Sequence, residues 1–128
     1  MSAFLTPLDA RQLDDSRWEL LNPLKYESTI GRALYVIPRG FVTDFASVPR
    51  LPLAYLLAGG TGNSAAVIHD FLYQTHITDK DEADNIFYEA LRVLDQPRWR
   101  CWMMYQAVSL FGQSAFDSGP SRYKVLNP

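Results

Sequence analysis

The sequence predicts an α+β fold in which a small N-terminal antiparallel sheet packs on three or four helices. Residues 1–45 contain short alternating or strand-forming segments separated by Pro and Gly. In residues 49–112 the apolar side chains instead recur at three- and four-residue steps, the spacing of amphipathic helices. Residues 113–128 are predicted to form an irregular tail. We expect one domain over residues 1–128.

Three strands are predicted in the N-terminal part. Residues 18–20 and 24–27 alternate between apolar and polar side chains, and residues 33–37 form a short run of strand-forming residues. Periodicity alone would also allow a helix at 33–37. The short length of this run, and the Gly and Pro near its ends, favour a strand.

Two helices are predicted in the first half of the helical part. The first covers residues 51–58, and the pair Gly59-Gly60 can end it because glycine adopts the left-handed conformation at low cost. The second helix begins at Asn63 or Ser64, either of which can cap it, and continues to about Gln74.

Two further helices are predicted after residue 77. Thr78 and Asp81 have the spacing of a capping box, which would begin the third helix. Pro97 is suited to open the fourth helix, and Gly112 to end it. The residues of the fourth helix that we expect to face the core are Trp99, Trp102, Met103, Ala107 and Leu110.

The composition excludes several classes of protein. With 128 residues, of which 48% are hydrophobic, the chain can bury a core of its own. The net charge of -2 offers no basic excess for a nucleic-acid partner. Cys101 is the single cysteine, which excludes a disulfide within the chain. No run approaches the roughly 20 apolar residues of a transmembrane segment, and the first residues lack the pattern of a signal peptide.

His69, Asp70 and Asp84 are the residues with the clearest potential for chemistry. A histidine beside a carboxylate, with a second carboxylate on the next helix, offers a general base, a residue to orient it and a metal ligand. If the two helices are antiparallel, Asp84 would reach His69 and fix its tautomer. Two alternatives remain: His69 is a buried core histidine, and Asp84 pairs with Arg92 or Arg50.

Asp44 and Asp70 are candidates for a metal site. Neighbouring residues of a helix diverge by about 100°, so Asp70 points away from the direction of His69. Asp44 lies in an otherwise apolar run, and together the two carboxylates could bind a hard cation such as calcium or another divalent cation. In the alternative interpretation, Asp44 is a turn residue that accepts hydrogen bonds from backbone N–H groups. Tyr73, on the same helix, is expected to pack with its hydroxyl on a carboxylate.

The motifs at residues 18–20, 40–50 and 69–73, followed by Ala83-Asp84, resemble the domain of unknown function 1353 family. Members of that family come from tailed phages and prophages. The resemblance therefore implies a phage protein that is encoded near the tail genes. Since the first residues lack a signal peptide, we expect it to be made in the host cytoplasm, and we expect its final location to be the virion tail.

The pattern His69-Asp70 with Tyr73, followed by Asp84, is also similar to the site motif of secreted phospholipases A2. That resemblance implies His69 as the base, Asp84 as its orienting acid and Asp70 as a calcium ligand, with Asp44 contributing by analogy. The chain departs from those enzymes because it has no disulfide and no Gly-rich calcium loop, and because the interval from His69 to Asp84 is short.

Two functions follow as expectations. The first is a phage tail-associated hydrolase of an ester or amide bond in host envelope lipid or peptidoglycan, in which His69 activates water with the help of a divalent cation. The second is a non-catalytic component of the tail tip or baseplate, which binds other tail proteins through residues 99–111 or through the Pro-rich ends. An enzyme requires His69 in a cleft open to solvent, whereas a structural cluster would be closed.

Overall fold

A computed structural model describes residues 1–58 and 62–127 and has six strands and five helices within these ranges. The α+β class is confirmed. The strands are β1 (Ala3–Phe4), β2 (Ala10–Gln12), β3 (Trp18–Leu20), β4 (Leu24–Ser28), β5 (Ala33–Ile37) and β6 (Val42–Thr43). The helices are α1 (Arg50–Ala58), α2 (Asn63–Thr75), α3 (Lys80–Val93), α4 (Arg98–Phe111) and α5 (Gln113–Arg122). The predicted stop at Gly59-Gly60 lies outside the described residues.

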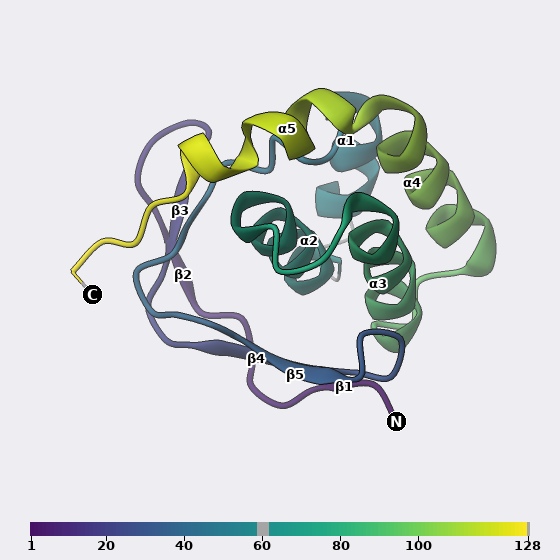
Figure 1. Ribbon diagram of the computed structural model, residues 1–128, viewed down its shortest axis with the longest axis horizontal. Helices are drawn as coiled ribbons and strands as arrows, with labels where there is room; N and C mark the ends of the chain where they lie inside the picture. Colours follow the sequence, from purple (N-terminus) through teal and green to yellow (C-terminus); the bar gives the residue numbers. More distant parts are fainter. Residues whose placement is uncertain (59–61, 128) are drawn as a thin grey trace.

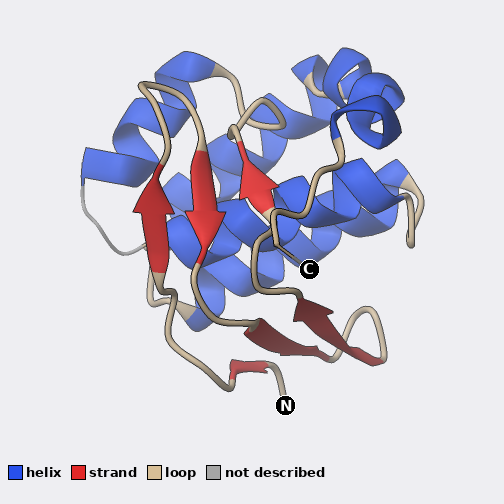
Figure 2. Ribbon diagram, turned by 90° about the vertical axis from the view of Figure 1, so that its left-hand side faces the viewer, coloured by secondary structure: helices blue, strands red, loops and turns tan. Residues whose placement is uncertain are grey.

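The strands form two small antiparallel sheets rather than the single sheet that we expected. One sheet has the order β1-β4-β5 and the other β2-β3-β6. In Figure 1 the two sheets follow one another around α2, and Figure 2 shows the strands against the helices. The predicted strands at 18–20 and 33–37 are found with these bounds, and β4 extends one residue further than predicted. Strands β1 and β6 have two residues each, too few for alternation to identify them, and β2, with the sequence Ala-Arg-Gln, has no alternation of two apolar residues about a polar one.

Helix α2 is the centre of the molecule. Every residue from Ala65 to Gln74 is buried, because α2 contacts α3, α5 and β6. The residue before it is Gly62, and no side-chain hydrogen bond caps its N-terminus, so the predicted cap at Asn63 or Ser64 is wrong. His76 ends the helix in the left-handed conformation, and its N–H donates to the carbonyl of Leu72 at 3.0 Å.

Helices α3 and α4 begin and end close to the predicted residues. Asp79 caps α3, since its side chain accepts a hydrogen bond from the N–H of Glu82 at 2.8 Å. The predicted capping box at Thr78 and Asp81 is therefore wrong by one residue. Pro97 precedes α4 and Gly112 ends it, as predicted.

The buried face of α4 differs from the predicted one. Cys101, Met104 and Val108 are fully buried, at the i, i+3, i+7 spacing of one helix face. Ala107 is also buried and Met103 packs against the core, as predicted. The expectation was wrong for three large side chains, because α4 is covered mainly by α3 and leaves its opposite face exposed. They are Trp99 (59% exposed), Trp102 (61%) and Leu110 (67%).

Helix α5 overturns the prediction of an irregular tail over residues 113–128, since residues 113–122 are helical. Gly119 is required for its close approach to α2, because a Cβ at this position would overlap the carbonyl oxygen of Tyr73. Pro120 cannot donate a hydrogen bond to the carbonyl of Phe116 four residues before it. That carbonyl instead lies 2.6 Å from Nε2 of His76, whose ring stacks on Phe116. The contact with α2 thus compensates for a Gly-Pro pair that would otherwise predict a loop.

No helix among residues 1–58 and 62–127 is long and apolar enough to cross a membrane.

Candidate functional site

The α2–α3 hairpin brings His69 and Asp84 together, as the sequence predicted. Nε2 of His69 lies 2.8 Å from Oδ1 of Asp84. The short connection after α2 turns the chain back, so that α3 packs against α2 along most of its length. Arg92, one of the alternative partners of Asp84, donates instead to the carbonyl of Gln96.

Tyr73 and Lys80 complete this first cluster. The Tyr73 hydroxyl donates to Oδ1 of Asp84 at 2.6 Å, which confirms the expectation that it would reach a carboxylate. Nζ of Lys80 lies 2.8 Å from Oδ2 of Asp84 and also donates to the carbonyls of Val108 and Ser109 on α4. Lys80 was missed from the sequence, although its i, i+4 spacing to Asp84 is a recognised signal for an ion pair.

The ring of His69 is closed off from solvent. Its side chain is 0% exposed, and its ring centroid lies 4.1 Å from that of Tyr73 and 4.5 Å from that of Phe87. Nδ1 is buried and has no hydrogen-bond partner among the described residues. The cluster therefore has the predicted pair of residues without the cleft that a hydrolytic base requires.

The protonation states in this cluster follow from burial and pairing. Burial lowers the pKa of His69, and the hydrogen bond to Asp84 offsets this only in part, so the imidazole is neutral at pH 7. Burial would raise the pKa of Asp84, but the hydrogen bonds from His69, Lys80 and Tyr73 outweigh it and the net shift is downward. Asp84 is therefore ionised, and Lys80 neutralises its charge.

Asp70 points away from His69, toward β6 and α5, as expected for neighbouring residues of a helix. Its Oδ2 accepts hydrogen bonds from Oγ1 of Thr43 at 2.6 Å and from Nε2 of Gln74 at 3.0 Å. Its side chain is 0% exposed. The pKa of Asp70 is raised to about 6, first because burial disfavours the charged form and second because of the nearby charge of Asp44.

Asp44 and Asp70 are brought together, but Arg122 of α5 lies between them. Nη1 of Arg122 is 3.0 Å from Oδ1 of Asp44 and 3.4 Å from Oδ1 of Asp70. Asp44 also accepts a hydrogen bond from the N–H of Ala46 at 3.0 Å, which is the turn role considered as the alternative. Arg122 could not be predicted, because it lies in the segment that was expected to be irregular.

These residues do not fit a calcium ion in this arrangement. Calcium takes six to eight oxygen ligands, whereas Asp44 and Asp70 supply two carboxylates with a guanidinium already between them. Within the described ranges, no group of three or more His, Cys, Asp or Glu side chains could hold a metal ion. The calcium site stays a prediction, and no chemical step through a metal follows from this geometry.

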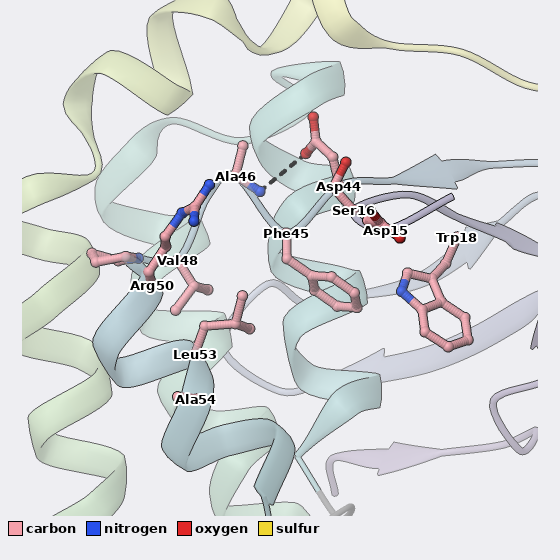
Figure 3. Close-up of a pocket in the computed structure, with 11 residues that line it drawn as sticks. Asp15, Ser16, Trp18, Asp44, Phe45, Ala46, Val48, Arg50, Leu53 and Ala54 are labelled. Atoms are coloured by element: carbon pink, nitrogen blue, oxygen red, sulfur yellow. Dashed lines mark hydrogen bonds between the residues drawn. The ribbon is translucent and has the colours of Figure 1, made fainter. Parts of the chain in front are cut away.

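A surface pocket lies beside Asp44, away from His69. It has a volume of about 760 Å³ and is formed by the turn before β3, the segment after β6 and the first turns of α1 (Figure 3). Asp44 is the only one of the four predicted site residues that lines this pocket.

A family model described as "Protein of unknown function (DUF1353)" matches residues 18–108. The match covers most of the chain, including all four predicted site residues, and ends before α5 and Arg122. No curated protein and no solved structure matches the chain.

Proposed function

This chain belongs to the DUF1353 family of proteins of unknown function, and we propose that it is a non-catalytic component of a phage tail, at the tail tip or baseplate, which binds other tail proteins. The phage tail part of the proposal rests on the resemblance of the chain's motifs. The non-catalytic part rests on one observation, which is that the His69 ring is completely buried.

The first cluster is better suited to hold helices together than to activate water. Both carboxylate oxygens of Asp84 already accept hydrogen bonds, from donors on α2 and α3. Lys80 extends the network to α4 through the carbonyls of Val108 and Ser109. A buried charge that is fully paired keeps its neighbours in a single arrangement, and removing one partner is costly. We therefore assign the cluster the role of fixing α2, α3 and α4 relative to one another.

The exposed face of α4 supports a binding role. Trp99, Trp102 and Leu110 lie on one side of the helix, because Trp102 and Leu110 follow Trp99 by three and eleven residues, which is close to one and three whole turns. Each is more than half exposed, and Phe111 at the end of the helix is 73% exposed. Tryptophans that project from a rigid helix are the side chains most often found at the centre of protein interfaces. The partner suited to this face is an apolar protein surface.

Two measurements test the proposal. The first is binding of this protein to purified tail proteins encoded by neighbouring genes, and the second is detection of this protein in purified phage particles. Trp99→Ser with Trp102→Ser should abolish binding and incorporation, whereas Leu34→Ser, a similarly exposed apolar position on β5, should leave both unchanged. Absence of the chain from particles, with no binding to any tail protein, would overturn the proposal.

A hydrolase is the second candidate, and one observation favours it. With Nε2 of His69 bonded to Asp84, the nitrogen left for a water is Nδ1, which has no partner among the described residues. Attack on an ester or amide of host lipid or peptidoglycan would then require the covering side chains to move, and a divalent cation would require Arg122 to leave Asp44 and Asp70. The assay is hydrolysis of phospholipid vesicles or purified peptidoglycan in the presence of calcium. If hydrolysis is observed and is lost in His69→Asn, the hydrolase replaces the structural proposal.

A further inference from the structure

The pocket beside Asp44 combines two aromatic rings with polar groups of both charges. Figure 3 shows the ring of Phe45 between the indole of Trp18 and the side chain of Leu53. The polar lining consists of Asp15, Ser16, Asp44 and Arg50, and the remaining lining residues are Ala46, Val48, Pro49 and Ala54. None of these residues belongs to the His69 cluster.

We propose that this pocket binds a neutral sugar unit of the hexose or N-acetylhexosamine class. A sugar ring has apolar C–H faces, which pack on aromatic rings such as Trp18 and Phe45, and hydroxyls at its edge that both donate and accept. Asp15 and Asp44 supply acceptors, while Arg50 and the indole N–H of Trp18 supply donors. This inference goes beyond the proposed function and does not depend on it.

The mixture of groups argues against other ligand classes. An anion such as phosphate would meet two carboxylates, and a cation would meet Arg50 in the lining and Arg122 behind Asp44. A purely apolar ligand would leave the charged groups without water or a partner. The volume of about 760 Å³ falls within the range of small-molecule sites, which runs from about 300 to 1,000 Å³.

The backbone that presents Phe45 is strained and held in place. Phe45 has a φ of 56°, in the left-handed region that a residue with a bulky side chain rarely occupies. Its carbonyl accepts a hydrogen bond from the N–H of Val48 at 3.1 Å, and Asp44 fixes the next residue through the N–H of Ala46. Strain of this kind persists where the surroundings over-determine it, often at binding sites.

A second cavity of about 210 Å³ shares Trp18 and Phe45 with the first. Because both cavities are lined by these two rings, a sugar chain of more than one unit would contact both of them.

Trp18 can report binding directly. The chain has three tryptophans, so the double variant Trp99→Phe with Trp102→Phe leaves Trp18 as the only one. Titration of this full-length variant with glucose, N-acetylglucosamine and tri-N-acetylchitotriose should give a saturable change in Trp18 emission, with a Kd of about 1 mM for the best sugar. The trisaccharide should bind more tightly than the monosaccharides, because it contacts both cavities.

Two further variants test the lining itself. Phe45→Ala should weaken binding about tenfold, and Asp15→Asn, an exposed position where folding is not at risk, about threefold. Asp81→Asn, an exposed carboxylate of α3 outside both cavities, should bind with unchanged affinity. The proposal is overturned if no sugar gives a saturable change up to about 50 mM, or if arginine amide or inorganic phosphate binds and no sugar does. The proposal would also be overturned if Phe45→Ala and Asp15→Asn both bound sugar as tightly as the protein with the unchanged pocket.

Discussion

Replacement of Asp84 by alanine tests the claim that the His69 cluster fixes the helices. Asp84→Ala removes one carboxylate that accepts hydrogen bonds from His69, Tyr73 and Lys80. The carboxylate is 2% exposed, so water cannot readily take its place.

The expected loss of stability follows from the state of each donor. His69 and Tyr73 are fully buried, and a buried donor without an acceptor costs about 1–3 kcal/mol. Lys80 is 12% exposed and keeps the carbonyls of Val108 and Ser109, so it adds little to this loss. We expect the free energy of unfolding to fall by about 4 kcal/mol, in the range measured when one member of a buried ion pair is removed.

Urea unfolding followed by circular dichroism measures this change. With a slope of about 2 kcal/mol/M, the midpoint should fall by about 2 M while the slope itself is unchanged. Asp81→Ala, at an exposed position three residues earlier, should change stability by less than about 0.5 kcal/mol. A loss below about 1 kcal/mol for Asp84→Ala would refute the reasoning, since it would mean that water reaches the donors and that the His69 ring is accessible.

Three further predictions concern the contacts of α5. Gly119→Ala should lower the free energy of unfolding by about 2 kcal/mol in thermal melts, because its Cβ would overlap the Tyr73 carbonyl. Ser114→Ala, at an exposed position of the same helix, should be neutral, and equal melting temperatures of the two variants would exclude the close packing. The pKa of Asp70 is raised from 3.8 in the unfolded chain to about 6 in the folded protein, so the folded state binds this proton more tightly. The stability that the protonated carboxyl contributes is therefore fully present below pH 3.8 and is lost as the pH rises through about 6, and the free energy of unfolding should fall by about 3 kcal/mol at most. Asp70→Asn should remove this decline from urea midpoints measured between about pH 4 and pH 7, and an unaltered decline would contradict the assignment. Millimolar calcium should leave the melting temperature of the wild-type chain unchanged, since Arg122 lies between the carboxylates, and a calcium-dependent increase would show that the guanidinium is displaced.

The parts of the fold that were predictable depend on local patterns. The strands at residues 18–20 and 33–37 have enough residues for alternation and β-propensity to identify them. The contact between His69 and Asp84 was predictable because a short connection between two helices leaves only an antiparallel arrangement.

The remaining features depend on distant contacts. Gly119 and Pro120 predict a turn by local rules, and only the surface of α2 makes that segment helical. The apolar residues of α4 allow more than one buried face, and the choice of Cys101 over Trp99 is made by packing against α3. The guanidinium between Asp44 and Asp70 belongs to Arg122 of α5. The spacing of Asp44 and Asp70 in the sequence therefore gave no indication of it.

The two buried polar clusters differ in when they can form during folding. His69 and Asp84 are 15 residues apart, within one helical hairpin, whereas Asp44 and Arg122 are 78 residues apart. Closing the longer loop costs about 1.4 kcal/mol more chain entropy. The hairpin can therefore assemble early, while Asp70 stays hydrated until α5 docks, which makes the burial of this carboxylate a reporter of a late step of folding.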